Sequence, residues 1–378
     1  MTHYKVLILS KETTGGTGKF IEYLVTMPSP QVKFMCTFYK KHYLSSKLPV
    51  PITLSQSAYP NTFTFSVQKI LLLIKNIFFT IRLLKTHHPN IVIACDFYSF
   101  VLFSVIKIIF LRKIIFITTI HLNIRKYTET KRGIYQYLLN FTFNVLKSVP
   151  DAYVTVSKGL SNQLQKEFHV CSEKITTIYN GVSLSNSRRK HRVRNKVQSI
   201  ITVGRLDTMQ KDYDTLLRSF LFVQQEFPLI TMKIVGDGRD RSKLEKLINK
   251  YELGDKVQIT GWVKDVSKYL IQSDVFVFSS FFEGFGYSLV EAMSVGLPVI
   301  STNIPFGPQE ILDRGKYGLL VPVEDSNEMA QKLEILIRSK KTREHFAALA
   351  LKRADDFSLG KMHEEYLQLF EKLQQKSN

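Results

Sequence analysis

Two acidic residues in the second half of the chain, Glu283 and Glu291, lie on either side of a glycine-containing turn. The turn follows the apolar run Val275–Phe278, which predicts a buried strand, and Glu291 falls within the first turns of the helix expected next. Gly284, Gly286 and the start of that helix offer free backbone amides, which form a ready site for an anion. The segment therefore predicts a loop that binds a phosphorylated ligand.

Each acidic residue also has a purely structural interpretation. Ser288 and Glu291 have the spacing of a capping box, in which the Glu only satisfies a backbone amide. Glu283 would then be a favourable charge near a helix N-terminus. Both acids surround one turn, in a chain that also has the basic loop described next, and this combination favours the binding interpretation.

A second candidate loop follows the expected strand Ser199–Val203 and contains Arg205 and Lys211. An arginine and a lysine on such a loop can converge on one diphosphate, the arginine as a fixed fork and the lysine as a mobile point charge. Together they can offset the charge that grows on a departing diphosphate, a task that metal ions perform in other enzymes. Two solvated surface cations are the structural alternative.

Two further segments resemble phosphate-binding or metal-binding motifs. Thr13–Phe20 is glycine-rich and follows the first expected strand, but Phe20 replaces the hydroxyl residue with which a P-loop holds Mg²⁺, so a turn that caps a helix is the alternative. Asp212-Tyr-Asp214 matches the DxD pattern of metal-dependent sugar transferases. We interpret it as a helix start, where capping and the helix dipole favour Asp.

The charge of the chain is unevenly distributed. The net charge is +20, and residues 1–178 contain 22 Lys+Arg against 7 Asp+Glu, which places +15 in this half. A basic, aromatic-rich half should be attracted to anionic lipid or to nucleic acid, and a merely soluble surface is the alternative. The sequence has no zinc-ligand spacing, RNA-binding motif or basic base-reading helix, which argues against nucleic acid.

Length and cysteine content predict a two-domain protein of a reducing compartment. The 378 residues exceed one typical core, and the three cysteines form no CxxC pair or even disulfide set. No secretory signal is visible, and Lys or Arg interrupts each apolar run before the about 20 residues that a membrane span needs. We therefore expect a chain that does not span a membrane.

Apolar strand-like runs alternate with helical patterns along the whole chain, which predicts α/β units with parallel sheets. The expected strands are Lys5–Leu9, Val32–Phe38, Ile91–Ala94, Ile114–Thr119, Ala152–Val156 and Ile175–Ile178, then Ser199–Val203, Thr231–Val235, Val257–Thr260, Val275–Phe278, Pro298–Ser301 and Gly318–Val321. Helices are expected at Gln68–His87 and Met362–Leu373, and a basic linker at Ser185–Lys196. Ligands of such sheets bind beyond the carboxyl ends of the strands, where the candidate loops lie.

The EX7E spacing of Glu283 and Glu291, together with Arg205 and Lys211, resembles the retaining glycosyltransferases of family 4. Similar short segments run nearly end to end: Val156-Ser157, Ile178–Val182, Ile234–Gly238, Gly261–Val263, Glu291–Pro298 and Gly318–Pro322. The resemblance implies a GT-B fold, with two Rossmann-like domains facing across a cleft. Its expected parts are an acceptor-side domain at residues 1–182, a basic linker at 183–197, a nucleotide-sugar-binding domain at 198–356 and a last helix at 357–378 that crosses back.

The resemblance also implies roles for the candidate residues. Arg205 and Lys211 would bind the donor diphosphate, which Gly16 would approach from the first domain. Glu283 would bind the donor sugar near the reacting carbon, and Glu291 would bind the ribose hydroxyls.

The remaining implied contacts complete the donor site. Val263 would meet the base through its backbone, and Gly286 and Ser288 would contribute at the helix start. His121, at a strand end, would reach the donor sugar, although a structural role is the alternative. Family members need no metal or other cofactor and keep the anomeric configuration by same-face attack, in which the leaving phosphate takes the proton of the acceptor.

The segment Pro305–Leu312 resembles members that extend surface polysaccharides or other lipid-linked glycans from UDP-sugars, often galactose or N-acetylated hexosamines. Their acceptors hang on a polyprenyl diphosphate, so we expect a cytoplasmic protein, peripheral on the inner face of the cell membrane. The basic first half fits attraction to anionic lipid. Another GT-B nucleotide-sugar enzyme, such as an epimerase, is the alternative, and the Arg/Lys loop with EX7E argues against it.

Overall fold

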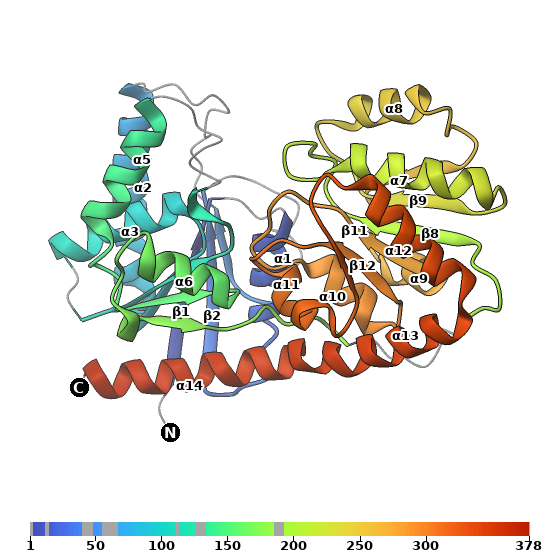
Figure 1. The fold of residues 1–378 in the computed structure, drawn as a ribbon. Coiled ribbons are helices and arrows are strands. Elements are labelled where there is room, and N and C mark those ends of the chain that lie inside the picture. Colours follow the sequence, from blue (N-terminus) through green and yellow to red (C-terminus); the bar gives the residue numbers. More distant parts are fainter. Residues whose placement is uncertain are drawn as a thin grey trace. The chain divides into compact units, whose positions relative to one another are not determined.

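The computed structural model describes residues 3–11, 15–39, 48–54, 67–110, 113–125, 134–184 and 193–377. The chain forms two compact units (Figure 1). Unit 1 comprises residues 1–181 and 360–378, and unit 2 comprises residues 182–359. Each unit is an α/β structure with a parallel sheet, as the alternation of strand and helix patterns predicts.

Unit 1 contains a seven-stranded parallel sheet in the order β3-β2-β1-β4-β5-β6-β7. Its strands are β1 (Tyr4–Ser10), β2 (Val32–Phe38), β3 (Ile52–Leu54), β4 (Ile91–Ala94), β5 (Ile115–Ile120), β6 (Ala152–Thr155) and β7 (Ile175–Thr177). Six of these were expected within one or two residues, and β3 was missed. This strand is a three-residue edge strand that directly follows Pro51, so its sequence lacks the length and apolar pattern of a typical strand.

The helices of unit 1 cover this sheet. They are α1 (Gly15–Leu24), α2 (Val67–His87), α3 (Phe97–Phe110), α5 (Ile134–Leu146), α6 (Lys158–Lys166) and α14 (Leu359–Ser377), with a short 3₁₀ turn η2 (Ser172–Lys174). The expected helix Gln68–His87 is confirmed as α2. The last helix is longer than the expected Met362–Leu373, and its packing on unit 1 includes ring contacts from Tyr366 to Phe20 and from Phe370 to Tyr4.

Unit 2 contains a six-stranded parallel sheet in the order β10-β9-β8-β11-β12-β13. Its strands are β8 (Ser199–Val203), β9 (Thr231–Val235), β10 (Val257–Gly261), β11 (Val275–Phe278), β12 (Val299–Thr302) and β13 (Leu319–Val321). All six lie where the apolar runs predicted them. The helices are α7 (Tyr213–Glu226), α8 (Arg241–Lys250), α9 (Ser267–Ile271), α10 (Tyr287–Ser294), α11 (Pro308–Ile311), α12 (Ser326–Arg338) and α13 (Lys340–Ala354), with 3₁₀ turns η4 (Asp313–Gly315) and η5 (Asp355–Phe357).

Part of the expected basic linker at 183–197 lies outside the described residues, at 185–192. The part that is described belongs to unit 2. The buried guanidinium of Arg343 donates to the carbonyl oxygens of Arg194 and Asn195 at 2.8 and 3.0 Å, and Arg194 pairs with Asp274 at 3.2 Å. Residues 194 and 195 are therefore fastened to this unit.

In the part of the chain that the structure describes, we find no helix long and apolar enough to cross a membrane. The longest helix of the first unit, α2, carries Lys75, Arg82 and Lys85 within its apolar run. These charges interrupt the apolar residues of α2 before they reach the length of a membrane span, as the sequence predicts.

Candidate active site

The two loops with candidate charges follow neighbouring strands of unit 2. Residues 204–212 follow β8 and residues 279–286 follow β11, and β8 lies directly beside β11 in the sheet. The strand order reverses at this pair, and in open α/β sheets the crevice beyond such a pair binds ligands. The fold thus brings both sequence-predicted loops to one point of the carboxyl edge.

The loop after β8 is held in place from the neighbouring strand connection. Oδ2 of Asp240 accepts hydrogen bonds from the amide and the hydroxyl of Thr208 at 2.9 and 3.0 Å. The amide of Asp240 donates to the carbonyl of Leu206 at 3.1 Å. These bonds fix the backbone between Arg205 and Lys211. Sequence reasoning did not identify Asp240, because nothing in its local pattern marks a contact 32 residues away.

Lys211 and Glu283 meet at the carboxyl edge. Nζ of Lys211 lies 2.6 Å from Oε1 of Glu283, and the two side chains are only 11% and 12% exposed. Removal of water strengthens such a pair, and loss of one partner leaves the other charge nearly buried and uncompensated. The two residues were chosen from separate motifs, and the structure joins them directly.

Two side chains that sequence reasoning missed surround this ion pair. The hydroxyl of Ser280 accepts from Nζ of Lys211 at 3.0 Å and donates to Oε1 of Glu283 at 3.1 Å. The ring of Phe278 lies beneath the ammonium, with 4.0 Å between Nζ and the ring centre. Ser280 could have been selected as a polar residue just beyond a buried strand. Nothing in the sequence indicates that the Phe278 ring lies against the Lys211 ammonium.

The helix after this loop begins differently from the capping-box interpretation. Helix α10 starts at Tyr287, and its N-cap is Gly286, whose φ of 115° is left-handed. Ser288 is therefore the second helical residue, and the interpretation of Ser288 with Glu291 as a capping box is wrong. The N-cap has no side-chain hydrogen bond to the helix start, an arrangement that suits anion binding at a helix N-terminus. Glu291 is half-buried one turn further along.

Arg205 and Val263 also lie at the carboxyl edge of this sheet. Arg205 is exposed at the start of its loop, where its carbonyl accepts a hydrogen bond from the hydroxyl of Tyr213 at 3.2 Å. Val263 is half-buried and follows β10, two strands away from β8. Its neighbour Trp262 is exposed and is the single tryptophan of the chain.

The DxD-like segment serves the helix start, as predicted. Asp212 is the N-cap of α7 and accepts a hydrogen bond from the amide of Thr215 at 3.1 Å. Asp214 instead accepts from the hydroxyl of Tyr251 at 2.7 Å. Among the described residues there is no cluster of three or more His, Cys, Asp or Glu that could hold a metal ion.

Gly16 and His121 belong to unit 1. Gly16 lies in the first turn of α1, and residues 12–14 of the glycine-rich segment lie outside the described residues. His121 follows β5, and its ring packs on Phe20 of α1 with 4.6 Å between ring centres. Nε2 of His121 lies 2.9 Å from the hydroxyl of Thr119. Within this unit, the histidine and the first turns of α1 thus share one end of the sheet.

Burial lowers the pKa of His121 to about 3, so the ring is neutral at physiological pH. In the unfolded chain the same ring takes a proton below its ordinary value of 6.5. The contribution of His121 to stability is therefore complete above pH 6.5 and is lost as pH falls below it. At pH 5 the loss amounts to about 2 kcal/mol.

We expect His121→Gln to lose less stability than the wild type on acidification. Urea unfolding gives the free energy of unfolding of each protein, and between pH 8 and pH 5 the wild type should lose about 2 kcal/mol more of it than the variant. If both proteins lose the same amount, His121 takes up its proton by pH 5 in the folded protein as it does in the unfolded chain.

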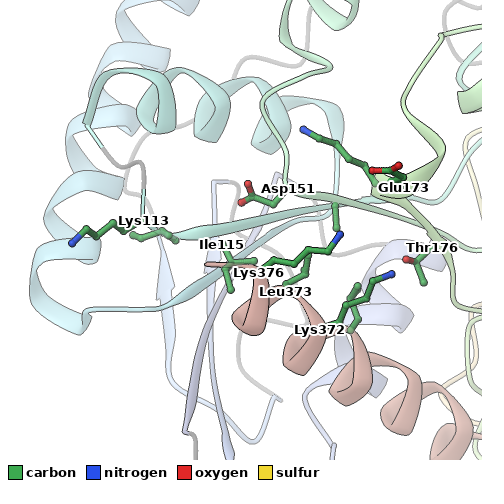
Figure 2. Close-up of a pocket in the computed structure, with 12 residues that line it drawn as sticks. Lys113, Ile115, Asp151, Glu173, Thr176, Lys372, Leu373 and Lys376 are labelled. Atoms are coloured by element: carbon green, nitrogen blue, oxygen red, sulfur yellow. The ribbon is translucent and has the colours of Figure 1, made fainter. Parts of the chain in front are cut away.

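Unit 1 also contains a hollow of about 290 Å³ that neither Gly16 nor His121 lines (Figure 2). It is lined by Ile115 and Ala152 at the amino ends of β5 and β6, by Thr176 of β7, and by Lys372 and Lys376 of α14. Ligands of parallel α/β sheets bind at the opposite, carboxyl ends. We therefore do not assign this hollow to the active site.

Two family profiles match the chain. The family described as Glycosyl transferases group 1 matches residues 185–353, and Glycosyltransferase Family 4 matches residues 42–186. Together these two matches extend over most of both units.

Curated relatives are glycosyltransferases. An uncharacterized glycosyltransferase of Methanocaldococcus jannaschii is 28% identical over 345 residues, which are 79% of this chain and 83% of that protein. A Campylobacter jejuni enzyme, N-acetylgalactosamine-N,N'-diacetylbacillosaminyl-diphospho-undecaprenol 4-alpha-N-acetylgalactosaminyltransferase, is 29% identical over 229 residues. That match covers 60% of this chain and 62% of the enzyme, which is less than two thirds of its length.

Solved structures show the same fold at low sequence identity. HepE of Anabaena, in complex with UDP and glucose, has a TM-score of 0.78 and 18% identity, with 98% of this chain and 100% of that chain covered. Sucrose-phosphate synthase of Thermosynechococcus elongatus has a TM-score of 0.81 and 18% identity, with 98% and 99% covered. With both family profiles, these findings identify the chain as a member of the family 4-type glycosyltransferases, with the GT-B fold.

Proposed function

We propose that the protein is a retaining, metal-independent hexosyltransferase that uses a UDP-hexose or a UDP-N-acetylhexosamine. Its acceptor would be a glycan linked to a polyprenyl diphosphate, in surface polysaccharide or glycan biosynthesis. The single observation that carries the proposal is the nearly buried pair of Lys211 and Glu283, 2.6 Å apart, at the strand-order reversal of unit 2.

The positive and the negative group of this pair can bind different parts of the donor. Lys211, with the fork of Arg205, would bind the diphosphate and stabilise the charge that develops on it as the glycosidic bond breaks. Glu283 would accept hydrogen bonds from the donor sugar near the reacting carbon. Ser280 contacts both charged groups and would hold them in register.

The rest of the donor would lie along the same edge. Gly286 and Ser288, at the uncapped start of α10, would offer amides to the diphosphate, and Glu291 would bind the ribose hydroxyls. The backbone of Val263 would meet the uracil. Gly16 and His121 would reach the diphosphate and the sugar from unit 1, with the His121 ring in its neutral form.

The reaction we propose is a same-face substitution. The acceptor hydroxyl attacks the anomeric carbon from the side on which the diphosphate departs, which keeps the anomeric configuration. The leaving phosphate takes the proton of the acceptor, so no side chain needs to act as general base.

The choice of donor and acceptor follows the relatives. HepE was solved with UDP-glucose, and the name of the Campylobacter enzyme specifies a diphospho-undecaprenol acceptor. Such an acceptor is held in the membrane, so we propose a cytoplasmic location, peripheral on the inner face. The +15 charge of residues 1–178 supports attraction to anionic lipid headgroups.

Slow hydrolysis of the donor without acceptor tests this function. The purified protein is incubated with UDP-, GDP- and ADP-sugars, and release of the nucleotide diphosphate is measured. Trp262 adjoins the proposed base contact, so its fluorescence should report binding of the accepted nucleotide. Hydrolysis of a UDP-hexose or UDP-N-acetylhexosamine is expected, and its absence across the UDP-sugars contradicts the proposal.

Activity should persist in EDTA. Arg205 and Lys211 would neutralise the diphosphate in place of a metal, and the Asp212 and Asp214 carboxylates accept hydrogen bonds from Thr215 and Tyr251. The measurement is donor turnover before and after chelation and after addition of Mn²⁺ or Mg²⁺. Turnover that stops in EDTA and returns with either ion would show that the enzyme needs a metal.

A further inference from the structure

Three neighbouring helices of unit 1 expose large apolar side chains. Helix α3 contacts both α2 and α5: the Asn76 amide of α2 donates to the Tyr98 hydroxyl of α3 at 2.7 Å, and the Phe100 ring of α3 lies 5.5 Å from that of Phe143 in α5. Among the side chains of these helices that the structure describes, the exposed large apolar ones are Leu71, Ile74, Phe78, Ile108, Ile109, Phe110, Tyr137, Phe141 and Val145.

The exposed residues of α2 and α5 lie on single helix faces. In α2, Leu71, Ile74 and Phe78 have helical spacing, and the opposite face buries Leu72 and Thr80. An ordinary surface helix exposes mainly polar residues on the face away from the core, whereas α2 also exposes these three large apolar side chains there.

The face of α5 has a similar character. Tyr137, Phe141 and Val145 follow each other at every fourth position, and the opposite face buries Phe143 and Leu146. The rings of Tyr137 and Phe141 are stacked, with 6.4 Å between their centres. Tyr137 and Phe141 are 66% and 56% exposed, so this stack adds two large rings to the surface.

Basic side chains accompany the apolar face of α2. Helical spacing places Lys75, Arg82 and Lys85 on the same side as Phe78, and all three are exposed. This combination of aromatic and aliphatic residues with Lys and Arg is typical of helices that lie in a membrane interface. A partner protein would have to be acidic to match the +15 charge of residues 1–178, whereas anionic lipid matches both the charge and the apolar character.

We propose that the outer faces of α2 and α5, with the C-terminal end of α3, insert into the interface of an anionic bilayer. This inference rests on the proposed function, because a polyprenyl-linked acceptor is held in such a bilayer. The charges attract the protein to the surface, and the apolar side chains anchor it there. Binding therefore has a part that salt weakens and a part that salt does not.

The test compares the full-length protein with the double variant Phe78→Ser/Phe141→Ser. Both side chains are exposed, so the variant should keep its fold. The control is Leu229→Ser, which removes an apolar side chain that is 88% exposed in unit 2. Co-sedimentation measures binding to vesicles of phosphatidylcholine with phosphatidylglycerol, and to vesicles of phosphatidylcholine alone.

The wild type and Leu229→Ser should bind the anionic vesicles equally well, and the double variant on the order of 10-fold or more weakly. Near 1 M salt, which shortens the Debye length to about 3 Å, the wild type should keep part of its binding and the double variant on the order of 10-fold less. Equal binding by all three proteins would overturn the proposal. A wild type that is dimeric without vesicles, with a monomeric double variant, would also overturn it, since the faces would then bind a second copy.

Donor hydrolysis separates this inference from the proposed function. The double variant should hydrolyse UDP-sugar in solution like the wild type, because its changes lie outside the donor site. If the protein binds vesicles but hydrolyses no UDP-sugar, the membrane-binding surface is supported and the proposed function is contradicted. Hydrolysis without vesicle binding would do the reverse.

Discussion

Lys211→Ala and Glu283→Gln should each lower kcat/KM by on the order of 10²-fold or more. Lys211→Ala removes the positive charge that we propose balances the departing diphosphate. Glu283→Gln removes the negative charge that we propose lies beside the sugar. In the folded protein each is also the ion-pair partner of the other, 2.6 Å apart. The change should appear mainly in kcat at saturating donor, because both groups act where transition-state charge develops.

The control is the partly exposed pair of Lys332 and Glu328 on α12, whose charged atoms are 3.6 Å apart and whose side chains are 30% and 35% exposed. Lys332→Ala and Glu328→Gln should leave activity unchanged, since this pair is about three times as exposed as Lys211 and Glu283 and lies on α12, outside the two candidate loops. Far-ultraviolet circular dichroism should show all four variants folded. Near-normal turnover by Lys211→Ala or Glu283→Gln at saturating donor would remove the proposed role of that residue.

The double variant Lys211→Ala/Glu283→Gln distinguishes a cooperating pair from two independent groups. If the residues act as one unit, the double change should cost little more than the larger single change. Multiplication of the two single effects would instead show that each group acts separately on the donor.

Much of the fold follows from the sequence, because buried parallel strands are short, uninterrupted apolar runs. All the strands of unit 2 and six of unit 1 coincide with such runs, including β11 at Val275–Phe278, every residue of which is buried. The edge strand β3 was missed because three residues after a proline carry no such pattern. Strand pairing then explains why loops 75 residues apart in sequence meet at one edge.

The site could be predicted only as far as its motifs reach. The sequence selected Lys211 and Glu283, but only the structure shows that they form a pair bridged by Ser280. The capping-box alternative for Ser288 is wrong because helix α10 begins at Tyr287, and a shift of two residues in a helix start is not visible in the sequence.

The apolar surface of unit 1 illustrates a different limit. Leu71 and Leu72 are adjacent leucines of α2, yet Leu71 is exposed and Leu72 is buried. Lys75, Arg82 and Lys85 share one side of the helix and indicate that this side faces outward, and helical spacing places Leu71 on it as well. That large apolar side chains stay exposed on this side is a property that only the structure shows.

Gly307→Ala should lower both activity and stability, because Gly307 touches the backbone of the Glu283 loop. A Cβ at this position would lie 1.8 Å from the carbonyl oxygen of Phe285, and the φ of Gly307 is 86°. The loop cannot retreat easily, since the Phe285 ring is buried and packs edge-on against Phe357 at 5.6 Å. The added methyl should therefore displace the loop that contains Glu283.

The matched control for this change is Gly315→Ala. Gly315 also has a positive φ, 99°, but a Cβ there would meet nothing within 4 Å. The free energy of unfolding of Gly315→Ala should fall only by the cost of placing a side chain on a left-handed residue, about 1–2 kcal/mol. Gly307→Ala should lose about 1–3 kcal/mol more from the overlap, as measured by urea unfolding.

Activity then separates the two variants further. With a displaced Glu283, Gly307→Ala should have a kcat/KM lower on the order of 10-fold or more, because small errors in placing a charged group weaken transition-state binding steeply. Gly315→Ala should keep normal kcat/KM wherever it is folded, since its strain does not reach the loop. Equal activity of the two folded variants would mean that the Phe285 backbone adjusts without moving Glu283, and that residues 305–308 do not position the site.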